Sequence, residues 1–231
     1  MSRGLNSFDG FQGMKAYNPQ DCKALDLFSA IKQNIECPFA KRSRLWGSPE
    51  WDSAKSLEEN VEAFGDSLSK FVNIAISEGL DGYVIAAPEV YGRSIEDLSV
   101  FTKKILIKLN SMSPILSTMN QNFEDPNWRF SYGGTSFFVT TFAPCYPKSN
   151  SRYAWGTGCT FILLQPEHSF DSANIPKGHG AAIRDVIRMA FKRNDRAYYD
   201  PKIIDAASEA IKYVKPLKLG SPPVEWWKAK A

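Results

Sequence analysis

The sequence predicts an α+β or mixed α/β fold, a single domain in which a short central sheet is flanked by helices. Its 231 residues suit one large domain, and 43% apolar with 23% charged residues is typical of globular proteins. Segments of helical spacing precede, separate and follow the apolar β runs, without a strict βαβ repeat. We place this domain at 21–231, behind an N-terminal arm at 1–20 that is rich in Gly, Ser, Asn and Gln.

The first helix is expected at 21–36, where apolar residues recur at helical spacing and Asp21 can cap the start. Cys37-Pro38 ends it, because proline disfavours helical geometry in the preceding residue. The segment 39–51 is basic and aromatic and lacks periodicity, which predicts an irregular loop. Its two Trp residues make it a candidate functional loop.

The middle of the chain alternates helices and strands. Ser56-Leu57-Glu58-Glu59 matches a capping box and predicts a helix that runs to about residue 75. The apolar run 80–88 reads as a short buried strand, and a second capped helix is expected over 94–109.

The second half of the chain carries the strongest β signals. Residues 128–142 indicate a hairpin or broken strand with its turn at Gly133-Gly134, and 159–165 indicates another strand. Helices are expected over 181–191 and 201–214. The tail at 222–227 is aromatic enough that we expect it to pack on the domain.

Composition excludes several classes of protein. The net charge of +3 comes from interleaved acidic and basic residues, so we expect no nucleic-acid partner. No apolar run approaches the ~20 residues that span a bilayer, and no targeting segment is visible, so we expect no membrane partner and a cytoplasmic protein. Phosphate-binding loops, zinc-ligand spacings and the serine-hydrolase elbow are missing from the sequence.

Two cysteines flanked by proline are the most informative positions for chemistry. Cys37 and Cys145 are either small buried apolar residues or thiolates presented to a cofactor, and Tyr146 adds a phenol beside the second. Thiolate, phenolate and imidazole all ligate haem iron, so His168 joins them, although a surface or helix-capping histidine is the alternative.

Basic and aromatic residues suggest how an anionic cofactor could be held. Arg44 and Arg152 carry planar guanidinium groups that match a carboxylate such as a haem propionate, unless they belong to a solvated basic face. Trp155 offers a flat apolar wall, unless it fills the core.

Several motifs together resemble the YqcI/YcgG family over residues of about 30 to 200. The motifs are Cys37-Pro38-Phe39-Ala40, the strand Gly-Gly-Thr-Ser-Phe-Phe-Val at 133–139, Pro-x-Ser-x-Ser-Arg at 147–152, Glu167-His168-x-Phe170 and Ile-Arg-x-x-Ile at 183–187. The resemblance implies a haem protein that uses O₂ to N-hydroxylate a guanidine or amino nitrogen.

One position departs from the family pattern, in which a histidine precedes the proline after the main strand. Tyr146 stands there, with Cys145 beside it, and the following arginine arrives as Arg152. The resemblance therefore implies that Cys145, Tyr146 or His168 ligates the iron. The implied cofactor-binding residues are Cys37, Arg44, Arg152 and Trp155, and the implied partners of a guanidinium are Glu167 and Asp171.

Three functions follow from this reasoning. The first is a haem-dependent mono-oxygenase that acts on a small nitrogenous substrate with O₂. The second is a non-catalytic haem or small-molecule sensor that binds through Cys37. The third is a fold without a cofactor, in which the prolines only end strands and the Trp residues only fill the core.

Overall fold

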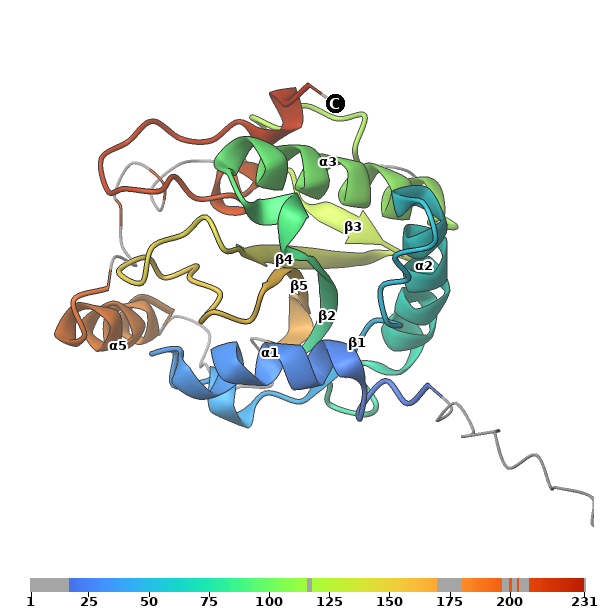
Figure 1. Ribbon diagram of the computed structural model, residues 1–231, viewed down its shortest axis with the longest axis horizontal. Helices are drawn as coiled ribbons and strands as arrows, with labels where there is room; N and C mark the ends of the chain where they lie inside the picture. Colours follow the sequence, from blue (N-terminus) through green and yellow to red (C-terminus); the bar gives the residue numbers. More distant parts are fainter. Residues whose placement is uncertain are drawn as a thin grey trace, which may run out of the picture.

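A five-stranded sheet separates two layers of helices (Figure 1). The computed structural model describes residues 17–115, 118–169, 180–196, 200, 203 and 208–230, without the side chains of 180–184. The strands are β1 (Leu45–Gly47), β2 (Gly82–Pro88), β3 (Phe130–Tyr132), β4 (Thr135–Phe142) and β5 (Cys159–Pro166). Their order is β1-β2-β5-β4-β3; β1 is parallel to β2, and the other pairs are antiparallel.

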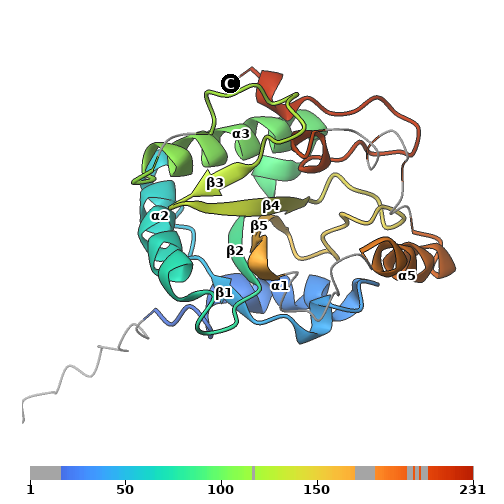
Figure 2. The same cartoon turned by 180° about the vertical axis from the view of Figure 1, so that it is seen from behind.

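The helices lie on both faces of this sheet, as two opposite views show (Figures 1 and 2). One face carries α2 (Leu57–Ile74) and α3 (Ile95–Ser111), and the other carries α1 (Lys23–Asn34). α5 (Gly180–Arg193) lies at the side of the α1 layer. Short 3₁₀ turns occur at η1 (Ala40–Arg42), η2 (Glu89–Gly92), η3 (Ala210–Lys212) and η4 (Trp226–Lys228).

Alternation along the central strands builds a core on each face. In β2, Tyr83 and Ile85 pack with α2 and α3, whereas Val84 and Ala86 pack with α1. β5 alternates in the same way, and its apolar residues from 160 to 164 are almost fully buried. The predicted class, a single domain with a short central sheet between helices, is confirmed.

Local sequence signals explain most element boundaries. The Ser56 hydroxyl accepts the Glu59 N–H at 3.1 Å, and Glu59 Oε2 accepts the Ser56 N–H at 2.8 Å, so the predicted capping box forms. At the predicted hairpin, Tyr132 pairs with Thr135, and Gly133 and Gly134 have φ values of 57° and 79°. Positive φ at both turn residues is what a two-residue type I′ turn requires.

The start of α1 differs from the prediction. The N-cap is Cys22, without a side-chain cap, and not Asp21. Asp21 instead closes a tight turn in which its N–H donates to the Asn18 carbonyl at 3.1 Å, so the helix begins later. Just before this turn, the Tyr17 hydroxyl lies 2.8 Å from the Ser67 hydroxyl; residues 1–16 of the predicted arm lie outside the described part.

The segment 39–51, for which the sequence predicts an irregular loop, contains η1 and the edge strand β1. A three-residue strand is too short to show alternation, so its pairing with β2 is not visible in the sequence. Its two Trp residues belong to the core: Trp46 Nε1 donates to Ser67 Oγ at 3.1 Å, and Trp51 packs 5.0 Å from the Tyr91 ring.

The C-terminal prediction holds in part. Within the helix predicted at 201–214, residues 201, 202 and 204–207 lie outside the described part, Ile203 is helical, and Ala210–Lys212 forms a 3₁₀ turn instead of an α-helix. The tail packs as expected: Trp226 is fully buried, and its Nε1 donates to the Ala210 carbonyl at 2.7 Å. Among the residues described, no helix is both long and apolar enough to cross a membrane.

Gly92 fixes the approach of η2 to the sheet and to the loop after β4. A Cβ atom there would lie 2.4 Å from Thr160 Oγ1 and 2.8 Å from Ala143 Cβ. We expect Gly92→Ala to lower the free energy of unfolding by about 1–3 kcal/mol, because neither neighbour can move freely.

Gly65→Ala is the matched control for urea unfolding followed by tryptophan fluorescence. Its new Cβ would meet Met112 Cε, the end of a flexible side chain, at 2.4 Å. Alanine also favours the helix by about 1 kcal/mol, so Gly65→Ala should be neutral or stabilising. Equal losses in the two variants would contradict the packing argument.

Candidate functional site

The loop 143–158 between β4 and β5 carries four of the predicted site residues. It begins against η2, where the Cys145 N–H donates to the Gly92 carbonyl at 3.0 Å. The C-terminal segment then holds it, because Asn150 Nδ2 donates to the carbonyls of Pro216 and Leu217 at 3.2 and 3.1 Å. This loop is therefore a fixed part of the domain.

The Tyr146 side chain helps to hold that loop in place. Its side chain is 1% exposed, and its hydroxyl donates to the Lys215 carbonyl at 2.8 Å. Burial raises the pKa of this phenol well above its usual value. A phenolate ligand needs both the lost proton and an accessible oxygen, so Tyr146 as described does not fit an iron ligand.

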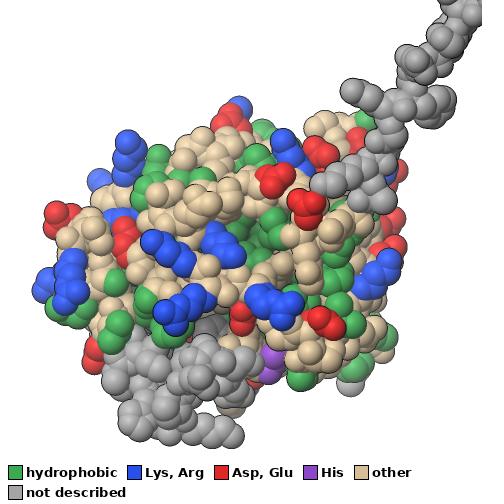
Figure 3. Space-filling view, turned by 90° about the horizontal axis from the view of Figure 1, so that it is seen from below, with side chains coloured by type: hydrophobic (Ala, Val, Ile, Leu, Met, Phe, Trp, Pro, Cys, Tyr) green, Lys and Arg blue, Asp and Glu red, His purple; other side chains and the backbone are tan. Residues whose placement is uncertain are grey.

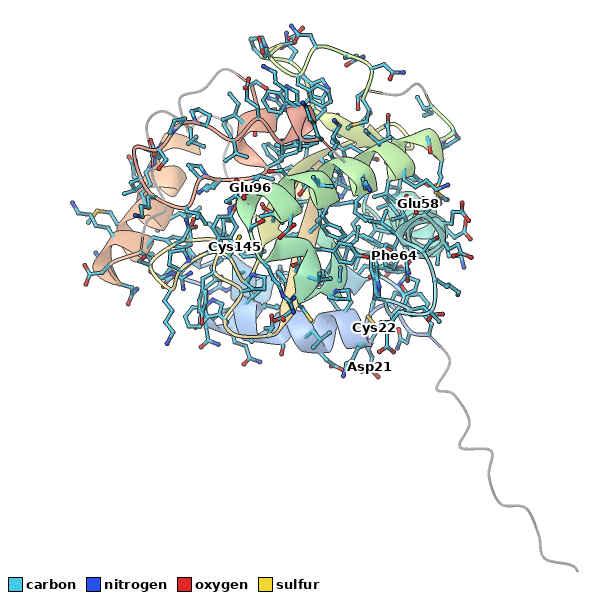
Figure 4. All side chains as sticks on the ribbon, turned by 45° about the horizontal axis from the view of Figure 1, so that its top comes forward. Asp21, Cys22, Glu58, Phe64, Glu96 and Cys145 are labelled. Atoms are coloured by element: carbon cyan, nitrogen blue, oxygen red, sulfur yellow. The ribbon has the colours of Figure 1, made fainter. Side chains whose placement is uncertain are left out.

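Cys145 lies on the same side of the sheet, against the α2 and α3 layer and near Glu96 at the start of α3 (Figure 4). It is partly exposed. The pKa of its thiol is raised to about 11, mainly by burial and to a smaller extent by the carboxylates of Glu96 and Asp97. The thiol is therefore protonated at neutral pH, and a cation that bound it would have to displace the proton.

The predicted residues after β5 lie at the other end of that strand. Glu167 is exposed, and its Oε1 lies 3.7 Å from Arg129 Nε, so this carboxylate already has a cationic neighbour. His168 follows it and is partly buried. Asp171 lies outside the described residues.

Arg44 and Cys37 lie on the α1 side of the molecule. Arg44 is exposed, and its guanidinium donates to the Glu78 carbonyl. Burial raises the pKa of the Cys37 thiol. All four cysteines of the chain are unbridged. Neither Arg44 nor Cys37 shares a core cluster with Cys145 and Tyr146.

A cluster that the sequence analysis missed joins the Cys37 segment to Trp155. Arg196, just after α5, lies with its guanidinium carbon 4.8 Å from the centre of the Trp155 ring. Its Nε is 3.4 Å from Glu36 Oε1, and its Nη2 donates to the Asn150 carbonyl at 2.7 Å. The Glu36 and Arg196 side chains are only 8% and 6% exposed, so this is a buried ion pair.

The electrostatics of Arg196 reflect that burial. Desolvation lowers the pKa of its guanidinium, and the charge of Glu36 opposes this effect. Arginine stays charged at physiological pH, and so the pair places two formal charges inside the protein. Such a pair contributes little net stability, because desolvation offsets the attraction.

Four buried polar atoms, three in this cluster and one on Thr157 two residues after Trp155, make no hydrogen bond within the part of the chain that the structure describes. They are Glu36 Oε2, Trp155 Nε1, Thr157 Oγ1 and Arg196 Nε. An unsatisfied buried donor or acceptor costs about 1–3 kcal/mol, and native proteins contain few of them. A small polar ligand with both donors and acceptors would satisfy these atoms.

The backbone around Trp155 is also unusual. Trp155 has φ = 55°, in the left-handed region, and is followed by Gly156 and Gly158 at φ = 71° and 65°. A non-glycine residue in this conformation costs on the order of 1–3 kcal/mol, and such strain gathers at functional sites. We therefore take Glu36, Trp155, Thr157 and Arg196 as the candidate functional site.

Arg152 lies between this site and the C-terminal segment. Its Nη2 donates to the Lys212 carbonyl at 3.3 Å, and its guanidinium carbon lies 5.8 Å from the centre of the Phe142 ring. Trp155 and Phe142 both belong to the α1 side of the sheet. Of the predicted cofactor-binding residues, Trp155 belongs to the cluster, Cys37 adjoins it through Glu36, and Arg44 lies elsewhere.

The family model for the YqcI/YcgG family matches residues 28–214, most of the chain. The chain belongs to the YqcI/YcgG family. No curated protein sequence and no solved structure matches it. The matched region contains the whole candidate site of this YqcI/YcgG protein and all nine predicted site residues.

No group of three His, Cys, Asp or Glu side chains is arranged to hold a metal ion among the residues described. The predicted ligands of this YqcI/YcgG protein are single side chains, and the structure does not gather Cys145, Tyr146 and His168 with the Glu36 cluster. Their roles stay predictions.

The sequence offered only a faint signal for the new residues. Glu36 directly precedes the Cys-Pro motif, but Arg196 lies three residues after a helix whose charged residues look solvated. The contact joins segments that are distant along the chain, and no local spacing predicts it.

Removing either charge of the Glu36–Arg196 pair leaves the other buried without its partner. We expect Glu36→Gln and Arg196→Met each to lower the free energy of unfolding by about 3 kcal/mol. The double variant should lose less than the sum of the two, by about 1–3 kcal/mol. Urea unfolding measures all three.

The control is the exposed pair Glu62–Lys108, whose Oε1 and Nζ atoms lie 2.7 Å apart. Glu62→Gln and Lys108→Met should couple by less than about 1 kcal/mol, as surface pairs do. Additive effects at Glu36 and Arg196 would show that the buried pair does not act as a unit.

Proposed function

We propose that this YqcI/YcgG protein is a haem-dependent mono-oxygenase that N-hydroxylates a small guanidine- or amine-containing substrate. The observation that carries the proposal is the buried Glu36 carboxylate, whose Oε2 has no hydrogen-bond partner. A cationic guanidinium or ammonium group suits such an oxygen, because charge-assisted hydrogen bonds are strong away from water. The family resemblance supplies the type of reaction.

An arginine beside the site suits a carboxylate of a haem. Arg152 carries a planar fork that can pair with a propionate, and Trp155 supplies an aromatic surface. Of the predicted iron ligands, Cys145 and His168 remain, since the Tyr146 hydroxyl is bonded to Lys215. When bound, haem supplies the O₂ chemistry, and the protein supplies binding and orientation.

The chain's own groups then have separate tasks. Glu36 Oε2 accepts N–H bonds from the substrate cation and so fixes which nitrogen faces the oxidant. The indole N–H of Trp155 and the hydroxyl of Thr157 donate to acceptor atoms of the bound molecules. Burial of the cluster excludes water, which strengthens each of these contacts. Glu36 thus takes the substrate role predicted for Glu167 and Asp171.

A second candidate is a protein that binds haem or a small molecule without catalysis. The hydrogen bond of Tyr146 and the raised pKa of Cys145 favour it, because both weaken the predicted ligation of iron. The same unpartnered atoms would then hold a small polar ligand. Formation of a hydroxylated product distinguishes the two candidates, because only the mono-oxygenase turns its ligand over.

The test is an assay with haem-loaded protein, a chemical reductant, ¹⁸O₂ and a panel of guanidine compounds, amino acids and amines. We expect mass spectrometry to find a hydroxylated product that carries one ¹⁸O atom. Glu36→Gln keeps the side-chain shape and removes the charge, so kcat/KM should fall at least about tenfold.

Glu62→Gln is the control, because Glu62 lies on the exposed surface of α2. Loss of activity in Glu167→Gln with none in Glu36→Gln would move the substrate to the end of β5. No labelled product from any compound of the panel, with haem bound, would overturn the mono-oxygenase proposal and favour the binding protein.

A further inference from the structure

A cavity of about 680 Å³ opens between α1 and the residues that lead into β1, apart from the Glu36 cluster. Figure 3 views this side and shows Lys and Arg side chains beside a hollow with hydrophobic side chains on its floor. α1 contributes residues spaced by three and four, which share one face of the helix. The lining residues are Gln20, Leu25, Phe28, Ser29, Lys32, Gln33, Lys41, Ser43, Arg44, Leu45 and Leu80.

The lining carries three cations and no carboxylate. Lys32 Nζ donates to the Ser43 carbonyl at 2.8 Å, and the Arg44 guanidinium donates to the Glu78 carbonyl. These partners are neutral, so they orient the two cations and leave their charges uncompensated. The carboxylate of Asp81 contacts the main chain of this segment, not a cationic side chain: its Oδ2 accepts the main-chain N–H of Arg44 at 2.7 Å. The described lining therefore favours an anion.

The uncharged residues of the lining indicate which kind of anion fits the cavity. Leu25, Phe28 and Leu45 offer an apolar surface against which a flat ring can pack. Gln20 and Gln33 offer amides that can pair with polar ring edges or sugar hydroxyls.

We propose that this cavity binds a phosphate-bearing small molecule of mononucleotide size. Arg44 and the two lysines would hold the phosphates, and the apolar floor would hold the base. The volume lies within the range of about 300–1,000 Å³ that is usual for small-molecule sites. No His, Cys, Tyr or Met lines the cavity, so the side chains that ligate haem iron lie elsewhere.

The experiment is isothermal titration calorimetry of the full chain with ADP, adenosine, inorganic phosphate and laurate. We expect ADP to bind, and adenosine and phosphate to bind at least about tenfold more weakly, because each supplies only part of the contacts. Lys41→Glu reverses one charge at an exposed position, and Arg44→Gln removes the guanidinium. Each should weaken ADP binding at least about tenfold.

Lys218→Glu is the matched control, an exposed lysine in the C-terminal segment that does not line the cavity. It should leave the Kd for ADP within about twofold. Arg44→Gln can also disturb folding. If Arg44→Gln is unstable, the ADP affinity of Lys41→Glu decides the result. No ADP binding, tighter binding of laurate, or equal effects of Lys41→Glu and Lys218→Glu would each overturn the proposal.

Discussion

The pairing of β5 with strands on both sides is the constraint on which the rest of the molecule depends. β5 is antiparallel to β2 and to β4, and its apolar side chains enter both cores. The loop 143–158 must therefore return from β4 and enter β5 at a fixed place. Its bonds to η2 and to the C-terminal segment leave it little freedom. That rigidity brings the strained Trp155 against Arg196.

The Glu36–Arg196 pair is costly in a way that stability alone does not explain. A well-packed apolar pair of the same volume is often as stable as a buried ion pair or more so. Here the pair also leaves polar atoms without hydrogen bonds and adjoins a residue in the left-handed region. Strain and unsatisfied polar atoms in one place are typical of a binding site that its ligand completes. The proposed substrate contact of Glu36 rests on that convergence.

Elements with a local physical signature could be predicted from the sequence. The capping box at Ser56, the Gly133-Gly134 turn and the apolar run of β5 each depend on neighbouring residues. The edge strand β1 could not be predicted, because three residues show no alternation. The site was predictable only in part: Trp155 belongs to it, but Glu36 and Arg196 meet only in the folded chain. Tyr146 occupies the position expected of a ligand. Its hydroxyl donates to the carbonyl of Lys215, 69 residues away, and no local sequence signal predicts such a tertiary contact.

The most direct measurement is the absorption spectrum of the protein titrated with haemin, then reduced with dithionite and exposed to CO. Tyr146→Phe, Cys145→Ser and His168→Ala are titrated alongside it. We expect a Soret band that saturates at one haem per chain and is retained in Tyr146→Phe, since the Tyr146 hydroxyl serves packing. Loss or a shift of the band in Cys145→Ser or His168→Ala identifies the ligand. Absence of a saturable Soret band, or its loss in Tyr146→Phe alone, would contradict the account.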